Sequence, residues 1–270
     1  MPGLNTITPK QLMRLIGTPD CPVLIDVRTD EDWQADPRYL PTARRLAHTQ
    51  PGALSEAAME GPVVVICHKG LKLSQGTAAL LRASGHRAEA LDGGFVAWAA
   101  DGLPLVPDTA IPPRHEGRTR WVTRHRPKID RIACPWLIRR FVDPSAEVLF
   151  VAPSEVLAVA ERFNAVPFDI EGVNLSHHGA LCSFDAMLSH FGLVDPALDR
   201  LAQVIRAADT NRHADVPQAA GLLALSVGLS RMYRDDMAQL DAAMPLYDAL
   251  YRWARDGFEE GHDWPTGQGT

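Results

Sequence analysis

A cysteine followed by a short cationic loop is the part of the sequence best suited to chemistry. The apolar run Val63–Ile66 ends at Cys67, and a histidine and two lysines follow before Ser74. A strand ending at the cysteine and a helix beginning near Ser74 would point loop amides and the positive helix end at the sulfur. These groups favour a thiolate, so we predict that Cys67 is a nucleophile. The alternative is a buried cysteine that ends a core strand.

The loop that follows Cys67 would also bind a small anion. The predicted substrate-binding positions are His68, Lys69, Gly70, Leu71, Lys72 and Ser74.

Two further motifs accompany this loop. Asp26–Val27–Arg28 follows an apolar run, and Leu91–Asp92–Gly93–Gly94–Phe95 precedes Trp98. With Cys67, they make residues 6–106 resemble a rhodanese domain, the single-domain sulfurtransferase module. The resemblance implies that Cys67 takes sulfane sulfur from a small thiosulfate or persulfide donor and passes it to an acceptor thiol, with no cofactor required. It also places Asp26 and Arg28 beside the substrate loop as structural and electrostatic support.

The loop departs from the common rhodanese pattern in length. Leu71–Lys72–Leu73 make it seven residues long counting Cys67, one more than in many single-domain rhodaneses. In this superfamily a longer loop accompanies a larger oxyanion centre, as in dual-specificity phosphatases and arsenate reductases. Those relatives carry an arginine near the loop end, whereas a lysine cannot make the bidentate fork to an oxyanion. The pattern argues against a phosphatase and leaves sulfur transfer and thiol-dependent oxyanion reduction open.

Composition limits the classes of protein. The chain has 270 residues and a formal charge of −6, which disfavours nucleic acid and membrane surfaces as partners. Its four cysteines are widely spaced, so neither a disulfide framework nor a zinc finger is indicated. Since the N-terminus lacks the pattern of a secretory signal, we expect a cytoplasmic protein.

Oxyanion reduction would need a resolving thiol near Cys67, which Cys134 or Cys182 would have to supply.

The pattern along the first part of the chain predicts an α/β fold. Strands over Val23–Val27, Val63–Cys67 and Arg87–Leu91 alternate with helices that begin at Thr8 and Ser74. Such alternation is typical of a parallel sheet, so we expect a small parallel-sheet rhodanese domain over residues 1–106.

A mainly α-helical second domain is expected over residues 121–256. A linker rich in proline and arginine, residues 107–120, precedes it, and a disordered tail, residues 257–270, follows it. The helices are predicted near 134–141, 153–163, 183–191, 196–208, 216–236 and 244–255, with short strands at Glu147–Val151 and Phe168–Ile170.

Several dense motifs occur in the second half: Trp121–Val122–Thr123, Arg126–Pro127–Lys128–Ile129–Asp130–Arg131, Cys134–Pro135–Trp136, Ser176–His177, Cys182–Ser183–Phe184–Asp185 and Gly228–Leu229–Ser230–Arg231. Through them, residues 121–255 resemble the C-terminal domain of the ChrB family of chromate-resistance proteins. That resemblance implies an association with bacterial chromate resistance.

The second domain also contains a candidate metal site. Imidazole, carboxylate and thiolate groups together suit a divalent transition metal. The predicted ligands are His177, Asp185 and Asp209, with Cys182 and Asp130 as substitutes. In the alternative, Ser183 caps a helix whose N-terminal dipole favours Asp185, and the histidines are ordinary loop residues.

A basic stretch, residues 114–131, could bind chromate or another oxyanion, or nucleic acid. The alternative is that its arginines pair with neighbouring carboxylates, as we also expect for Arg139 and Arg140. The preferred function is a rhodanese-type sulfurtransferase linked to chromate resistance. The alternatives are an oxyanion reductase and a non-enzymatic metal or chromate sensor that uses the rhodanese domain for docking.

Overall fold

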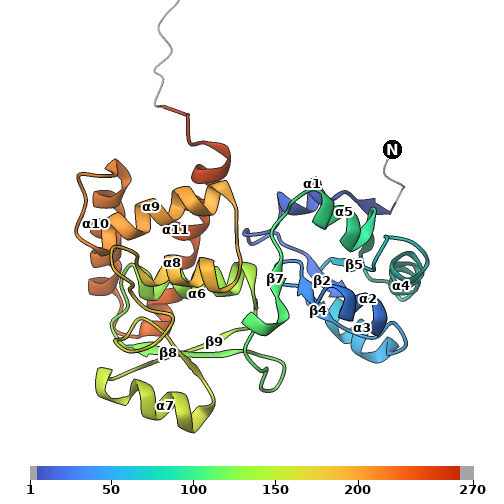
Figure 1. Cartoon of the computed structure of the whole chain (residues 1–270), viewed down its shortest axis with the longest axis horizontal. Helices are drawn as coiled ribbons and strands as arrows, with labels where there is room; N and C mark the ends of the chain where they lie inside the picture. The colour runs from blue at the N-terminus through green and yellow to red at the C-terminus, as the bar shows by residue number, and fades with distance from the viewer. Residues whose placement is uncertain (1–4, 262–270) are drawn as a thin grey trace, which may run out of the picture.

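The computed structural model describes residues 5–261 and contains two packed α/β units (Figure 1). The first unit is built on a five-stranded parallel sheet of order β1-β6-β5-β2-β4. Its strands are β1 (Thr6–Ile7), β2 (Val23–Asp26), β4 (Arg44–Arg45), β5 (Val63–Ile66) and β6 (Ala88–Leu91). Its helices are α1 (Pro9–Met13), α2 (Asp30–Ala35), α3 (Pro51–Ala58), α4 (Lys72–Ala83) and α5 (Gly94–Ala100). The predicted parallel sheet is therefore confirmed.

The central strand β5 determines where Cys67 points. All four residues of β5 are buried, because helices cover both faces of the sheet. Side chains alternate along a strand, so Val64 and Ile66 join one hydrophobic core, whereas Val63, Val65 and Cys67 join the other. This second core also contains side chains of α3 and α4. Cys67 therefore lies on the α4 face of the sheet.

The second unit combines a small parallel sheet with helices. Its strands, in the spatial order β10-β8-β9, are β8 (Arg120–Arg124), β9 (Glu147–Val151) and β10 (Val166–Pro167). Its helices are α6 (Asp130–Phe141), α7 (Val156–Phe163), α8 (Ser183–His190), α9 (Pro196–Asp209), α10 (Pro217–Met232) and α11 (Asp236–Asp256). The expected helical predominance is present, and β9 lies where predicted.

Other boundaries in the second unit differ from the sequence prediction. Helices α6 and α11 begin at Asp130 and Asp236, well before the predicted starts at 134 and 244. Both contain an internal proline, Pro135 or Pro245, and proline is typical of a first helical turn. Packing on neighbouring helices keeps each helix continuous through its proline. The strand predicted at Phe168–Ile170 lies at Val166–Pro167 instead, and β8 was missed within the basic stretch.

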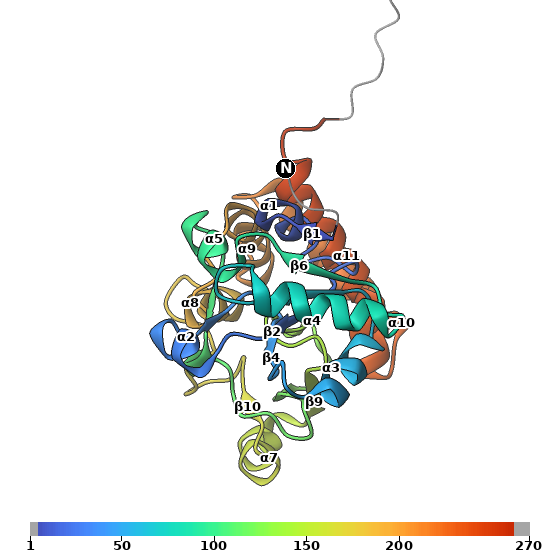
Figure 2. The same ribbon diagram turned by 90° about the vertical axis from the view of Figure 1, so that its right-hand side faces the viewer.

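The two units share one hydrophobic core. The larger core includes Leu12 and Trp98 from the first unit together with Trp136 and Tyr251 from the second. Gly17 lies at this junction, where an added Cβ would approach the Tyr251 ring at 2.5 Å. The second unit therefore covers the α1 and α5 face of the first sheet, and Figure 2 shows α4 on the opposite, outer side.

Residues 107–120 are docked between the two units. The strand β7 (Val106–Pro107) pairs with β3 (Arg38–Tyr39), and η1 (Asp108–Ala110) follows it. Arg114 then forms an ion pair of 2.9 Å with Asp143. This segment therefore contributes contacts to the junction.

The last described residues also have contacts. Phe258 packs against Trp253, with 5.3 Å between ring centroids, and residues 262–270 of the predicted disordered tail lie outside the described residues. Among residues 5–261, no helix combines the length and the apolar character needed to cross a membrane.

Candidate functional site

Cys67 lies directly after β5, where the chain turns toward α4. Helix α4 begins at Lys72, two residues before the predicted start, and its N-cap residue is Leu71. Ser74 therefore lies in the first turn and does not cap the helix. Its Oγ lies 3.1 Å from Cys67 Sγ, and both residues are buried. A hydroxyl at this distance can donate a hydrogen bond to a thiolate.

The backbone of the Cys67 loop is held by the turn that begins α5. The amides of Phe95 and Val96 donate to the carbonyls of Cys67 and His68, each at 3.0 Å. A Cβ on Gly94, where φ is +60°, would lie 2.2 Å from the Cys67 carbonyl oxygen. Only glycine permits this approach, which explains why a Gly-Gly turn accompanies the cysteine loop.

The cationic residues of the loop are available to an anion. Lys69 and Lys72 are exposed, and neither has an ion pair within the described part of the chain. His68 Nδ1 is buried and lacks a hydrogen-bond partner among residues 5–261. Gln75 Nε2 donates to the Gly70 carbonyl at 3.0 Å and steadies the loop. The loop therefore presents positive charge beside a buried sulfur.

Asp26 and Arg28 form a buried ion pair behind Phe95, whose amide donates to the Cys67 carbonyl. The Arg28 side chain is fully buried, and its Nε donates to Asp26 Oδ2 at 2.8 Å. Its guanidinium also donates to the carbonyls of Asp36 and Arg38 and lies 3.9 Å from the centroid of the Phe95 ring. Asp26 is equally buried, so the structure gives neither side chain a surface for substrate contact.

The other cysteines do not belong to the hydrophobic core that contains Cys67. All four cysteines are free. Cys134 and Cys182 are fully buried in the larger core, whereas Cys67 belongs to the core on the other face of the sheet. Burial raises the pKa of both thiols well above the ordinary value. Neither has the exposure or the ionisation expected of a resolving thiol.

A second group of chemical side chains lies in the second unit. His177 Nε2 is 3.0 Å from Asp209 Oδ2 and 3.4 Å from Asp130 Oδ2. These three residues can each offer a ligand atom within 4.8 Å of the other two. The structure therefore brings together His177 and Asp209 of the predicted ligands with Asp130, a substitute in that prediction.

Asp169 borders this group and was missed by sequence reasoning. Its Oδ2 accepts from Arg124 at 2.8 Å and forms an ion pair with Arg131 at 3.2 Å, while its Oδ1 accepts from Ser183 Oγ at 2.8 Å. Asp169 is 3.6 Å from His177 Nε2, but its oxygens are already engaged. The sequence prediction placed Asp169 within a strand at Phe168–Ile170, whereas it lies two residues after β10.

Asp185 and Cys182, which were also predicted as metal ligands, lie outside this group. Asp185 forms a two-point ion pair with Arg206 at 2.6 and 2.8 Å and accepts from the Cys182 amide at 3.0 Å. Asp185 thus stabilises the start of α8, as in the alternative interpretation. The N-cap residue, however, is the buried Cys182 and not Ser183, whose Oγ donates to Asp169 instead. Of the other histidines, His178 contacts the Asn174 carbonyl at 2.8 Å.

The crowding of acidic groups changes their proton affinity. Burial raises the pKa of Asp130, and burial together with the Asp130 charge raises the pKa of Asp209 to about 7. The hydrogen bond to Asp130 raises the pKa of His177 to about 9 despite partial burial. Without another cation, the imidazolium of His177 is therefore the counter-ion of these carboxylates.

Comparisons with known proteins divide the chain where the structure does. Residues 8–101 match the family described as rhodanese-like domain, and residues 121–254 match the family described as ChrB, C-terminal domain. The chain therefore joins a rhodanese-like domain to a ChrB C-terminal domain.

Two relatives cover the two domains separately. The chain is 37% identical over 141 residues to Protein ChrB of Cupriavidus metallidurans, which is 52% of this chain but only 42% of that protein. It is 31% identical over 104 residues to a sulfurtransferase of Allochromatium vinosum, which is 38% of this chain and 95% of that protein.

Solved structures match the rhodanese-like domain. The crystal structure of a rhodanese-like domain protein from Staphylococcus aureus is 23% identical, with a TM-score of 0.30, over 35% of this chain and 91% of that one. That of the thiosulfate sulfurtransferase from Pseudomonas aeruginosa is 27% identical, with a TM-score of 0.32, over 39% of this chain and 20% of that one.

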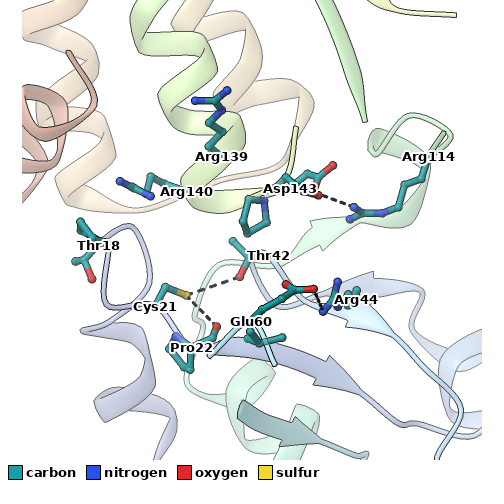
Figure 3. A pocket seen from close by; sticks show the side chains of 14 residues that line it. Thr18, Cys21, Pro22, Thr42, Arg44, Glu60, Arg114, Arg139, Arg140 and Asp143 are labelled. Atoms are coloured by element: carbon teal, nitrogen blue, oxygen red, sulfur yellow. Dashed lines mark hydrogen bonds and ion pairs between the residues drawn. The ribbon is translucent and has the colours of Figure 1, made fainter. Parts of the chain in front are cut away.

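A cavity of about 220 Å³ lies between the rhodanese-like and ChrB domains (Figure 3). Arg139 and Arg140 approach it from α6, and Cys21 and Thr42 approach it from the other side. The arginines around it are engaged: Arg140, for example, forms an ion pair with Asp248 at 2.8 Å. Burial raises the pKa of Cys21 to about 11, so this thiol is not a second nucleophile.

The arginines of the basic stretch, residues 114–131, are likewise engaged. The arginine partners are Asp143 for Arg114, Glu147 for Arg118 and Arg120, Asp169 for Arg124 and Arg131, and the Tyr233 and Ser230 carbonyls for Arg126. Arg139 and Arg140 pair with Asp241 and Asp248, as predicted. These ion pairs follow the alternative in which the arginines neutralise nearby carboxylates.

Proposed function

We propose that the protein is a sulfurtransferase that carries sulfane sulfur as a persulfide on Cys67. The observation that carries this proposal is the position of Cys67 Sγ, 3.1 Å from Ser74 Oγ and beside a loop whose lysines have no ion pair among residues 5–261. The rhodanese-like family match and the sulfurtransferase relative support the same chemistry.

The proposed reaction has two displacement steps. The Cys67 thiolate attacks the outer sulfur of thiosulfate, a new S–S bond forms, and sulfite leaves with the electron pair of the broken S–S bond. An acceptor thiolate then attacks the terminal persulfide sulfur and releases the Cys67 thiolate. Lys69, Lys72 and the first amides of α4 would stabilise the anions in both steps, because these helix amides lack partners inside the helix.

Oxyanion reduction by a pair of thiols is less well supported. It needs a second thiol that can reach Cys67, but Cys134 and Cys182 are fully buried on the other side of the sheet. We therefore assign the ChrB domain a role in linking sulfur transfer to the response to chromate. We place the activity in the reducing cytoplasm, where free cysteines persist.

The proposal is tested by intact-mass measurement of the whole protein after treatment with thiosulfate. We expect a gain of one sulfur atom in the wild type and in Cys21→Ser, no gain in Cys67→Ser, and loss of the added sulfur as thiocyanate on addition of cyanide. A wild-type protein that alkylates at Cys67 but gains no sulfur would contradict the proposal for this donor and acceptor pair. The Cys21→Ser control tests the half-buried thiol at the domain junction.

A further inference from the structure

The cluster of Asp130, His177 and Asp209 plays no part in the chemistry of Cys67. These residues come from the start of α6, the segment before α8 and the end of α9. The three helices contact one another in the ChrB domain (Figure 1). They bring together three residues that are far apart in the sequence.

The separations within the cluster suit ligands of one ion. Two ligand atoms bound to the same first-row metal at about 2.1 Å lie roughly 3–4 Å apart. The distances from His177 Nε2 to Asp209 Oδ2 and Asp130 Oδ2 are 3.0 and 3.4 Å. Only a small movement of these side chains is needed to coordinate one ion, because all three ligand atoms already lie within 4.8 Å of one another.

An independent observation comes from Asp130 itself. Its exposed fraction is 1%, and its Oδ1 has no hydrogen-bond partner within residues 5–261. Its Oδ2 accepts from the Ser183 amide at 2.6 Å, which fixes the carboxylate in place. A buried carboxylate oxygen without a partner is costly, and coordination of a cation removes that cost.

The backbone before Asp130 is also held in an unusual conformation. Ile129 has a φ of +41°, which is unfavourable for a β-branched residue. Its amide donates to Ser226 Oγ at 3.1 Å and its carbonyl accepts from Tyr247 at 3.0 Å. Contacts from two other helices therefore maintain the strain that positions Asp130.

Within residues 5–261, His177 is the one cationic side chain that forms an ion pair with Asp130 or Asp209. Arg124 and Arg131 pair with Asp169, and no arginine or lysine pairs with Asp130 or Asp209 within the described chain. A cavity of about 520 Å³ lined by His177 and Asp169 opens beside the cluster. A bound ion would therefore keep coordination positions open to water or to an anionic ligand.

We propose that Asp130, His177 and Asp209 bind one divalent first-row transition metal in the ChrB domain. One imidazole and two carboxylates are donors for ions such as Mn²⁺ and Zn²⁺, whereas metals that require thiolates are disfavoured because neither Cys134 nor Cys182 belongs to the cluster. Ser183 and Asp169 would orient the ligands from outside. This site is independent of sulfur transfer at Cys67.

The test uses the full chain after removal of metal with EDTA and dialysis. MnCl₂ and ZnCl₂ are added in separate equilibrium dialyses, and bound metal is measured by elemental analysis. We expect one ion per chain for at least one metal and an affinity at least tenfold lower in His177→Ala and Asp209→Asn. His178→Ala, which removes the adjacent histidine, should bind as the wild type does.

Thermal unfolding provides a second measurement, which distinguishes loss of metal binding from loss of folding in a variant. The metal should raise the midpoint of the wild type and of His178→Ala and should leave the midpoint of a folded Asp209→Asn protein unchanged. Absence of stoichiometric binding of both metals to the wild type would overturn the proposal and leave the His177 imidazolium as the cation. Undiminished binding in both ligand variants would also overturn it.

Discussion

At the residue scale, we expect the reactivity of Cys67 to depend on a neighbouring hydroxyl. Ser74 Oγ is the side-chain partner of the sulfur, at 3.1 Å. We predict that Ser74→Ala lowers the rate of Cys67 alkylation by iodoacetamide at pH 7 by about tenfold or more, because a hydrogen bond to a charged group contributes about 1.5–3 kcal/mol. Ser84→Ala, an exposed change at the end of the same helix, should have no effect. Equal rates in all three proteins would show that Ser74 does not stabilise the thiolate.

Arg28 is also a residue-scale determinant, but of stability. Its side chain is fully buried and bonded to Asp26 and two carbonyls. We predict that Arg28→Lys lowers the free energy of unfolding by about 2 kcal/mol or more, because lysine cannot reproduce the planar fork of donors. Urea unfolding measures this change. The matched control is Arg38→Lys, since Arg38 forms a half-exposed pair with Asp36 and should contribute less than about 1 kcal/mol.

At the scale of elements, the Cys67 loop depends on how closely α5 approaches β5. Gly94 lies at this contact with φ of +60°. We predict that Gly94→Ala lowers the free energy of unfolding by about 2 kcal/mol or more, through backbone strain and the clash with the Cys67 carbonyl, and abolishes sulfur loading. Urea unfolding and intact mass measure the two effects.

The control for this change lies within α4. A Cβ added to Gly76 would meet no atom within 4 Å, and Gly76 is in the helix interior. Gly76→Ala should therefore raise the free energy of unfolding by about 0.5–1 kcal/mol. If Gly94→Ala retained wild-type stability and loading, the turn would not be holding the loop.

At the scale of the whole molecule, the larger core crosses the domain boundary, so we expect the chain to unfold as one unit. An added Cβ at Gly17 would lie 2.5 Å from the Tyr251 ring and 2.6 Å from the Phe141 ring. We predict a single calorimetric transition for the full chain and a lower midpoint for Gly17→Ala. Gly102→Ala has similar backbone strain but no neighbouring atom, so its midpoint should fall less. Two resolved transitions in the wild type would contradict the shared core.

The domain junction also makes stability depend on pH. Burial favours a higher pKa for Asp143, but Arg114 and the hydrogen bonds from Thr119 and Ser145 outweigh it, so the pKa lies below the ordinary value of 3.8. The ionised carboxylate therefore stabilises the fold above that value, and this contribution is lost as pH falls through the lower folded pKa. We predict that Asp143→Asn lowers the free energy of unfolding by about 2 kcal/mol at pH 7 and by less at pH 3. An equal loss at both pH values in urea unfolding would refute the ionic explanation.

Local patterns determined the main features of the rhodanese-like domain. A continuous apolar run indicates a strand buried on both faces, so Val63–Ile66 located β5 and Cys67 without any long-range information. The alternation of strands and helices was sufficient to predict the parallel sheet. Ser74 was expected to begin the helix and to bind substrate, but its contact with the sulfur was not predicted, because α4 begins two residues early.

Long-range pairing was decided only by the tertiary structure. His177 and Asp209 were selected from their residue types, but Asp185 has the same chemistry and pairs instead with Arg206. The sequence likewise indicated arginines between 114 and 131 without showing that β8 runs through them. The physical reason is that ligand groups and ion pairs depend on distances across helix contacts, whereas hydrophobic periodicity records only the local burial of each element.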